Sequence, residues 1–226
     1  MAFENLNAIR ERDPAAPTFC EVFFGYNGYH AVLFHRLSSA IWGLGLRALA
    51  RFTSNFARIL TGIEIHPEAQ IGRRLFIDHG TGVVIGQTAV SGDDVTIYHG
   101  VTLGGVGRGD DRGQKRHPTI EDGAMIGAGA QVLGDITVHK RAKVGANSVV
   151  TQDIPEGKTA LGIPARVIGG DEKSRGYGLP SRQEMEQVTF TIDCIIKEMG
   201  TIKKELNIPE KDCTAPKDEK KSAAKA

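Results

Sequence analysis

Residues 65–83 of the chain read IHPEAQIGRRLFIDHGTGV and place an aliphatic residue at every sixth position. The spacing continues beyond them, and the two runs are Ile65, Ile71, Ile77, Val83, Ala89, Val95 and Val101, then Ile120, Ile126, Val132, Val138, Val144 and Val150. A period of six matches neither the helical period of about 3.6 nor the strand period of about 2. It is typical of hexapeptide β-helices, in which short strands joined by tight bends stack aliphatic rows inside a coil. We therefore predict a mainly β protein built on a parallel β-helix over residues 61–169.

Two details of the repeat lead to further expectations. Gly72, Gly127 and Gly145 directly follow repeat residues, and we expect a positive φ there because glycine reaches it at little cost. Val101 and Ile120 are 19 positions apart, one more than three hexads, and the segment between them is rich in Gly, Asp and Arg. Residues 104–118 are therefore predicted to form a loop that protrudes from the coil.

The composition is that of an ordinary globular protein. The chain has 226 residues, 40% of them hydrophobic and 24% charged, with a formal net charge of +1, which gives no electrostatic case for nucleic acid or an anionic membrane. The first residues, MAFENLNAIRERDPAAP, are charged and lack the apolar centre of a signal peptide. Three cysteines, Cys20, Cys194 and Cys213, lie far apart without metal-binding spacing. We expect a cytoplasmic protein that binds neither nucleic acid nor membrane.

Residues on both sides of the coil are predicted to be helical. Residues 1–60 show apolar residues at helical spacing, as at Phe34, Leu37 and Ile41, and Gly43 and Gly45 indicate a turn between two helices. Residues 163–166, IPAR, follow the last repeat and are predicted to form its closing turn.

Residues 170–208 are predicted to form a linker and a heptad helix. Its apolar seam alternates spacings of three and four and comprises Met185, Val188, Ile192, Ile195, Met199, Ile202 and Leu206. β-branched residues at both core positions of a heptad favour trimeric coiled coils. The alternative is a single amphipathic helix that lies on its own subunit. The charged residues 209–226 are predicted to be a disordered tail.

Candidate catalytic groups concentrate around the first turn of the coil, at Glu64 and at Asp78-His79. A neutral histidine can accept a proton from a hydroxyl near pH 7, and a carboxylate beside it orients the ring. Glu64 and His79 are 15 residues apart, close to a coil turn of about 18, so the spacing is compatible with a contact without proving it. The alternative is that His79 only caps a turn.

Two further residues have the chemistry to bind an amino acid. Arg116 can hold a carboxylate through two parallel hydrogen bonds, and Asp13 can accept from an ammonium group. The alternatives are a solvated loop charge for Arg116 and a helix N-cap before Pro14 for Asp13.

Several motifs follow one another in a fixed order. They are ERDPAAP, GYHAVLFHRLSSAIW, IEIHPEAQIGRRLFIDHGTGVVIGQTA, VTLGG, KRHPTI, MIGAGAQVLGDI, VGANSVV and GIPARVIG. In this order they resemble the serine O-acetyltransferases, the hexapeptide-repeat enzymes of cysteine biosynthesis, over about residues 8–169. The resemblance implies a left-handed coil, direct acetyl transfer from acetyl-CoA to the hydroxyl of L-serine in a ternary complex, and no metal.

The resemblance also implies roles for individual residues. His79 matches the general base and Glu64 its carboxylate partner, where the family often has Asp. The positions that hold serine are matched by Asp13 and Asp78 for its ammonium, and by Arg116 and His117 for its carboxylate across a subunit boundary. Coenzyme contacts are implied near Gly104, Gly105, Gly127, Ala128, Gly145 and Ala146.

The sequence also departs from the family pattern. Only about 60 residues precede the coil, where many members have a longer helical region that joins two trimers, so we expect a homotrimer. Many members end in an isoleucine that enters the active site of cysteine synthase. This sequence ends in AKA, which argues against that partnership.

Three other functions are compatible with a hexapeptide coil. The first is acetyl transfer to another small amino acid such as homoserine, because one methylene contributes only about 1–3 kcal/mol of discrimination. The second is a γ-carbonic-anhydrase-like zinc enzyme that uses histidines among His66, His79, His99 and His117. The third is a non-catalytic trimeric scaffold, which would leave the combination of His79 and Arg116 unexplained.

Overall fold

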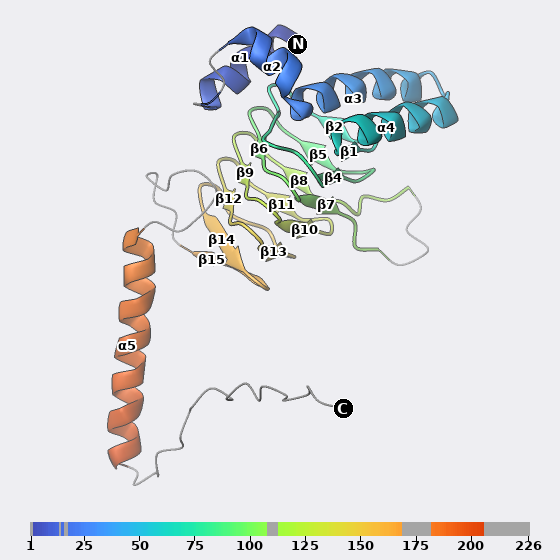
Figure 1. The fold of residues 1–226 in the computed structure, drawn as a ribbon. Coiled ribbons are helices and arrows are strands. Elements are labelled where there is room, and N and C mark those ends of the chain that lie inside the picture. The colour runs from blue at the N-terminus through green and yellow to red at the C-terminus, as the bar shows by residue number, and fades with distance from the viewer. Residues whose placement is uncertain (1, 14, 16–17, 108–112, 169–181, 206–226) are drawn as a thin grey trace, which may run out of the picture. The chain divides into compact units, whose positions relative to one another are not determined.

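The computed structural model describes residues 2–13, 15, 18–107, 113–168 and 182–205. The chain divides into two compact units, Met1–Ser181 and Arg182–Ala226, which are described separately. In the first unit, helices precede a coil of short strands and lie at the end of the coil where the first strands begin (Figure 1). These helices are α1 (Ala2–Arg12), α2 (Phe19–Gly25), α3 (Asn27–Gly43) and α4 (Arg47–Thr61).

The coil has three faces, because each strand from β1 to β10 pairs in parallel with the strand three positions later in the chain. The first face contains β1 (Glu64–Ile65), β4 (Val84–Ile85), β7 (Thr102–Gly104), β10 (Gln131–Leu133) and β13 (Val149–Val150). The second contains β2 (Gln70–Ile71), β5 (Val90–Ser91), β8 (Thr119–Ile120) and β11 (Thr137–Val138). The third contains β3 (Phe76–Ile77), β6 (Thr96–Ile97), β9 (Met125–Ile126), β12 (Lys143–Val144), β14 (Thr159–Gly162) and β15 (Ala165–Ile168). The chain thus visits the faces in turn, as a β-helix requires.

The predicted closing turn is present at the end of the coil. β15 runs antiparallel to β14, with Gly162 paired to Ala165. This hairpin ends the parallel ladder of the third face.

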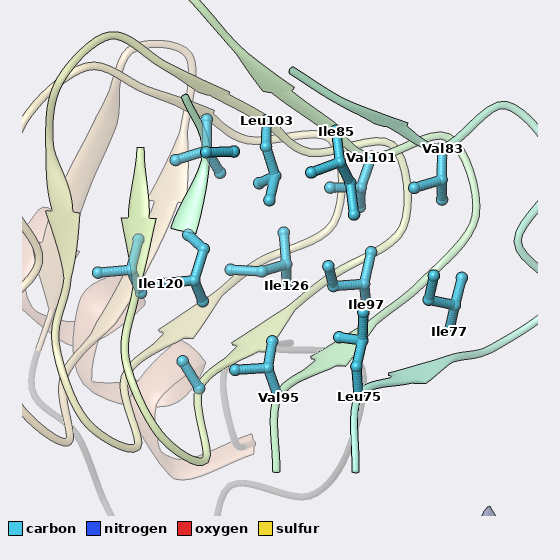
Figure 2. Close-up of a cluster of buried hydrophobic side chains, with 14 of the residues drawn as sticks. Leu75, Ile77, Val83, Ile85, Val95, Ile97, Val101, Leu103, Ile120 and Ile126 are labelled. Carbon is cyan, nitrogen blue, oxygen red and sulfur yellow. The ribbon is translucent and has the colours of Figure 1, made fainter. Parts of the chain in front are cut away.

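The predicted aliphatic rows form the core of the coil. All thirteen residues of the two runs are buried, none more than 8% exposed. Figure 2 shows side chains such as Ile97, Ile126 and Val101 gathered in the interior of the coil. At about 25 cal/mol per Å² of buried apolar surface, such stacked rows are the main stabilising contribution to the coil.

The first run nevertheless spans two different rows. Ile65 pairs with Ile85, 20 positions later, and not with Val83, so the first turn is longer than the 18 residues that separate Ile85 from its partner Leu103. The two additional residues are accommodated at the bend between β3 and β4. The later members of the run form a second buried row, and each lies two positions before an inward-facing strand residue, as Val83 does before Ile85. This row contains Val83, Ala89, Val95 and Val101.

The protruding segment also shows in the strand pairing. Leu103 pairs with Val132, 29 positions later, whereas Val132 pairs with Val150 after 18. The chain therefore leaves the coil after β7 and returns at β8. Residues 108–112 of this loop lie outside the described residues.

The expected positive φ at Gly72, Gly127 and Gly145 is wrong, because none of the three is among the left-handed residues. A Cβ atom at Gly72 would lie 2.2 Å from the carbonyl oxygen of Gly92, and one at Gly127 would lie 2.7 Å from the backbone nitrogen of Ala146. Close approach to the next turn of the coil therefore requires glycine at these two positions.

Helices α3 and α4 form a hairpin that is anchored on the coil. Gly45, with φ of 80°, lies in the predicted turn between them, and Gly62, with φ of 73°, ends α4 in the left-handed conformation common at helix ends. Arg36 on α3 donates from Nη1 to the carbonyl oxygen of Ile71 at 2.6 Å and also bonds that of Gly72. These contacts fix the helical region against the first turn of the coil.

The second unit contains the helix α5 (Arg182–Glu205), which covers most of the predicted heptad seam. Ile192, Ile195, Met199 and Ile202 are each 50–52% exposed on this helix. The described residues do not include the linker 170–181, Leu206 at the end of the seam, or the tail 209–226. None of the described helices is long and apolar enough to cross a membrane.

Candidate functional site

His79 lies in the bend between β3 and β4, where the first turn of the coil has its additional residues. Its φ of 58° is in the left-handed region that residues other than glycine adopt rarely, and Gly80 follows with φ of 77°. The side chain is 65% exposed. The same conformation recurs at other bends of the coil, as at Asn147, and here it turns the imidazole away from the aliphatic interior.

Two titratable side chains are close to His79. Its Nε2 is 3.8 Å from Oδ1 of Asp78, and its ring centroid is 5.7 Å from that of His99 on the next turn of the coil. Burial raises the pKa of Asp78, the charge of His79 opposes this, and the charge of Asp13 raises the pKa further. Asp78 thus lies in a site whose negative charge is only partly compensated.

A cavity of about 520 Å³ opens beside this bend and brings distant parts of the chain together. Its lining includes Asp13, Tyr26, Gly28, Asp78 and His79. Three of the predicted site residues, Asp13, Asp78 and His79, therefore face one cavity.

Asp13 enters the cavity from the end of α1. Its backbone nitrogen bonds the carbonyl oxygen of Ile9 at 2.8 Å, its Oδ1 accepts from the backbone nitrogen of Ala15 at 2.8 Å, and its Oδ2 accepts from the hydroxyl of Tyr26 at 2.5 Å. Asp13 is not the N-cap of α2. The N-cap of α2 is Thr18, whose hydroxyl accepts from the backbone nitrogen of Glu21.

Glu64 is placed differently from the other predicted residues. It lies on β1, paired with Val84, and its Oε2 is 3.9 Å from Nε of Arg58. Glu64 also lines a second cavity of about 210 Å³ with residues of α4. Among the described residues, the structure records no ion pair between Glu64 and His79, and the carboxylate nearest to the imidazole is that of Asp78.

Arg116 and His117 lie at another edge of the coil, beside the bend between β4 and β5. Both backbone nitrogens donate to the hydroxyl of Thr88, at 3.1 and 3.2 Å, and Arg116 Nη2 donates to Gln87 Oε1 at 2.8 Å. His117 is 7% exposed, and a Cβ atom at Gly86 would lie 2.0 Å from its ring. Burial and the neighbouring cations Arg116 and Lys115 lower the pKa of His117. Neither Arg116 nor His117 lines the cavity of His79.

The residues expected to contact the coenzyme are divided between the same two edges. Gly129 bonds through its backbone nitrogen to the carbonyl oxygen of His99 at 2.8 Å, and Asn147 bonds to that of Ala128 at 2.8 Å. Gly127-Ala128 and Gly145-Ala146 therefore stack above the bend of His79. Gly104 and Gly105 are on the other edge, where a Cβ atom at Gly105 would lie 3.0 Å from His117 Nε2.

The sequence did not place two further residues at this site: His99, considered only as a zinc ligand, and Tyr26. His99 follows His79 by 20 positions, the length of the first turn, so the correct register would have placed it above His79. Tyr26 reaches Asp13 through the packing of α1, α2 and α3, for which the sequence contains no periodic signal.

The zinc alternative needs His, Cys, Asp or Glu side chains that lie close together. Within residues 2–13, 15, 18–107, 113–168 and 182–205, no group of three His, Cys, Asp or Glu side chains could hold a metal ion.

The sequence is similar to known acetyltransferases. Residues 117–152 match the family model "Bacterial transferase hexapeptide (six repeats)". A serine acetyltransferase of Mycobacterium tuberculosis is 56% identical over 172 residues, which cover 76% of this chain and 74% of that protein. A serine acetyltransferase of Bacillus pumilus is 46% identical over 91% of this chain and 94% of its own length.

Solved structures have the same fold. The serine acetyltransferase of Neisseria gonorrhoeae in complex with serine is 42% identical, with a TM-score of 0.70 over 74% of this chain and 67% of that chain. A serine acetyltransferase in complex with CoA is also 42% identical, with a TM-score of 0.70 over 74% of this chain and 68% of that chain. These similarities place the coil described above among the left-handed β-helices.

Proposed function

Because the chain belongs to the serine acetyltransferase family, we propose that the cavity lined by Asp13, Asp78 and His79 binds L-serine during acetyl transfer. The chain is an acyltransferase, and acetyl-CoA is its co-substrate. The reaction gives O-acetyl-L-serine and CoA for cysteine biosynthesis. The assignment of the site rests on the cavity, because two carboxylates and an exposed imidazole line it together.

The role of His79 is that of a general base. A neutral imidazole takes the proton of the serine hydroxyl while the oxygen attacks the thioester carbonyl, and the same proton can then leave with the CoA sulfur. The acetyl group passes directly to serine, so no covalent acyl-enzyme is needed. Holding both substrates together makes the attack effectively intramolecular, which can lower the barrier by about 7–11 kcal/mol.

Asp13 and Asp78 form the subsite for the ammonium group. Two carboxylates that face one cavity repel each other, and the raised pKa of Asp78 is partly a consequence of that repulsion. A bound ammonium group compensates both charges, whereas a neutral acceptor such as a sugar would leave them facing each other. This arrangement favours an amino acid over an uncharged alcohol.

Arg116 and His117 complete the site from a neighbouring subunit of a homotrimer in this proposal. In the chain described here they lie beside the bend between β4 and β5, while His79 lies at the bend between β3 and β4. A three-faced coil can place one edge of each subunit against a different edge of the next when three copies assemble around an axis. Serine would then bind between Asp13 and Asp78 of one subunit and Arg116 of another.

We also propose that α5 contributes to the trimer as a coiled coil. The seam of Ile192, Ile195, Met199 and Ile202 is about half exposed, which is the state expected of core positions that await partner helices.

Ending the chain after residue 180 is therefore expected to lower the thermal stability of the trimer and to raise its dissociation constant. Light scattering over a dilution series, together with thermal melts, measures both quantities. A lysine at Ile195, in the middle of the seam, should have the same effect, while a lysine at Thr191 next to the seam should not. Unchanged mass and melting temperature in the truncated chain would remove α5 from the assembly.

The function itself is tested by release of the CoA thiol from acetyl-CoA in chelator-treated protein, with and without L-serine. We expect release that depends on serine, and formation of O-acetyl-L-serine in equal amount. Two other acceptors serve as comparisons. Homoserine lengthens the side chain of serine, and 3-hydroxypropionate lacks its ammonium group. Faster release with homoserine than with serine would assign a different amino-acid substrate, and no release with any acceptor would refute acetyl transfer.

A further inference from the structure

Tyr26 makes a short hydrogen bond to one of the two carboxylates of the cavity. Its hydroxyl lies 2.5 Å from Asp13 Oδ2, while the backbone nitrogen of Ala15 is 2.8 Å from Oδ1. Each carboxylate oxygen of Asp13 thus has one donor and retains a further lone pair for a ligand. A hydrogen bond to a charged acceptor at this distance is among the strong ones in proteins.

The backbone that carries Tyr26 is fixed directly on the coil. Tyr26 lies between α2 and α3, where its nitrogen bonds the carbonyl oxygen of Val22 at 3.3 Å. Two residues later, a Cβ atom at Gly28 would lie 2.2 Å from the carbonyl oxygen of Ile77. Ile77 immediately precedes Asp78 and His79, so Tyr26 and the catalytic bend share one rigid frame.

The other side of Asp13 is anchored independently. Arg12, at the end of α1, donates from Nη1 to the carbonyl oxygen of Asp94 at 3.1 Å and forms an ion pair with its carboxylate. Asp94 lies on another edge of the coil from His79. Arg12 therefore sets where the backbone of Asp13 is, and the hydroxyl of Tyr26 sets where its carboxylate points.

Tyr26 remains a hydrogen-bond donor at neutral pH. Burial raises the pKa of its hydroxyl, and the hydrogen bond to Asp13 and the charges of Asp13 and Asp78 raise it further. The phenol keeps its proton, because deprotonation would add a third negative charge to a cavity that already holds the carboxylates of Asp13 and Asp78.

We infer that Tyr26 is a positioning residue for amino-acid recognition: its hydroxyl holds the Asp13 carboxylate opposite Asp78 so that the two bracket the ammonium group of the acceptor. The inference rests on the function proposed above and names a residue that determines its specificity. Tyr26 acts on binding of the acceptor through Asp13 and takes no part in proton transfer at His79.

The test is Tyr26→Phe, which removes the hydroxyl and keeps the ring. We expect about a tenfold rise in the serine KM, the effect of one hydrogen bond to a charged group, with kcat and the acetyl-CoA KM changed less than about twofold. The matched control is Tyr29→Phe, the same change three residues later in a tyrosine that is buried among Leu6, Ile9, Val22 and Phe76. The control should leave the serine KM unchanged.

A double-mutant cycle shows whether Tyr26 acts through Asp13. In an Asp13→Asn background, Tyr26→Phe should change the serine KM by less than about twofold, because the carboxylate it orients is gone. A second tenfold rise in that background would overturn the inference, as would an unchanged KM in Tyr26→Phe alone. A fall in kcat together with a lower melting temperature would instead make Tyr26 a purely structural residue and overturn the inference too.

Calorimetric titration of L-serine separates this inference from the proposed function. Weaker serine binding by Tyr26→Phe than by the unchanged protein supports the inference even if no acetyl transfer occurs, in which case only the proposed function fails. Equal serine affinity in the two proteins contradicts the inference while leaving serine-dependent CoA release, and hence the proposed function, intact.

Discussion

Replacing His79 by asparagine is expected to lower kcat by about two to four orders of magnitude, the usual contribution of a general base. Asparagine is the better choice than alanine because His79 has φ of 58°, and asparagine tolerates the left-handed region that penalises alanine. The amide cannot accept the hydroxyl proton near pH 7, yet the bend keeps its conformation. Steady-state rates of CoA release measure kcat, and thermal melts check that the fold is retained.

The control for this substitution is His139→Asn. His139 is also a partly exposed coil histidine, with its Nδ1 3.3 Å from Glu121 Oε2, but it does not line the cavity. Its replacement should leave kcat unchanged. If His79→Asn retains more than about a tenth of the activity, His79 is not the base, and His99, whose ring centroid is 5.7 Å away, becomes the first residue to replace.

The carboxylate expected to orient His79 is not the one that lies nearest to it in the structure. The sequence predicts Glu64, whereas the structure has Asp78 Oδ1 at 3.8 Å from the imidazole and Glu64 within 3.9 Å of Arg58. The pairing of Glu64 with His79 remains a prediction. The ion pair of Glu64 with Arg58 is partly exposed and therefore weak, so it would not prevent Glu64 from turning towards His79.

The coil could be predicted from the sequence because its signal is local and repeated. Each hexad contributes one buried aliphatic residue, so errors at single positions do not change the period. The exact register could not be predicted at the bend of His79. Val83 and Ile85 are both aliphatic and both buried, so hydrophobicity alone does not show which of them continues the row of Ile65.

The site was predictable in its residue types and not in its geometry. Asp78 and His79 are adjacent in sequence, and their placement follows from the bend. The contact between Asp13 and Tyr26 depends on how α1 and α3 pack on the coil, through Arg12 and through the close approach of Gly28 to Ile77. Such tertiary contacts have no periodicity, and so the sequence indicates the acidic residue but not the tyrosine that orients it.

Arg116→Ala is expected to raise the serine KM by about 30-fold or more, because removing one partner of a desolvated ion pair costs at least about 2 kcal/mol. The rate at saturating serine should fall much less, since Arg116 holds the carboxylate and not the reacting hydroxyl. Arg166→Ala is the matched control, because Arg166 is exposed on β15, in the hairpin that closes the coil. An unchanged serine KM in Arg116→Ala would remove Arg116 from the pocket.

The same variant tests whether the site lies between subunits. When subunits carrying His79→Asn and subunits carrying Arg116→Ala assemble together in equal amounts, about one site in four should combine an intact His79 with an intact Arg116 from the neighbour. The assembled population should therefore recover about a quarter of the low-KM activity, although neither parent has it. If both residues acted within one subunit, every site would lack one of them. No recovery in samples where native mass spectrometry finds mixed trimers would thus place His79 and Arg116 of each site in the same chain and contradict a site between subunits.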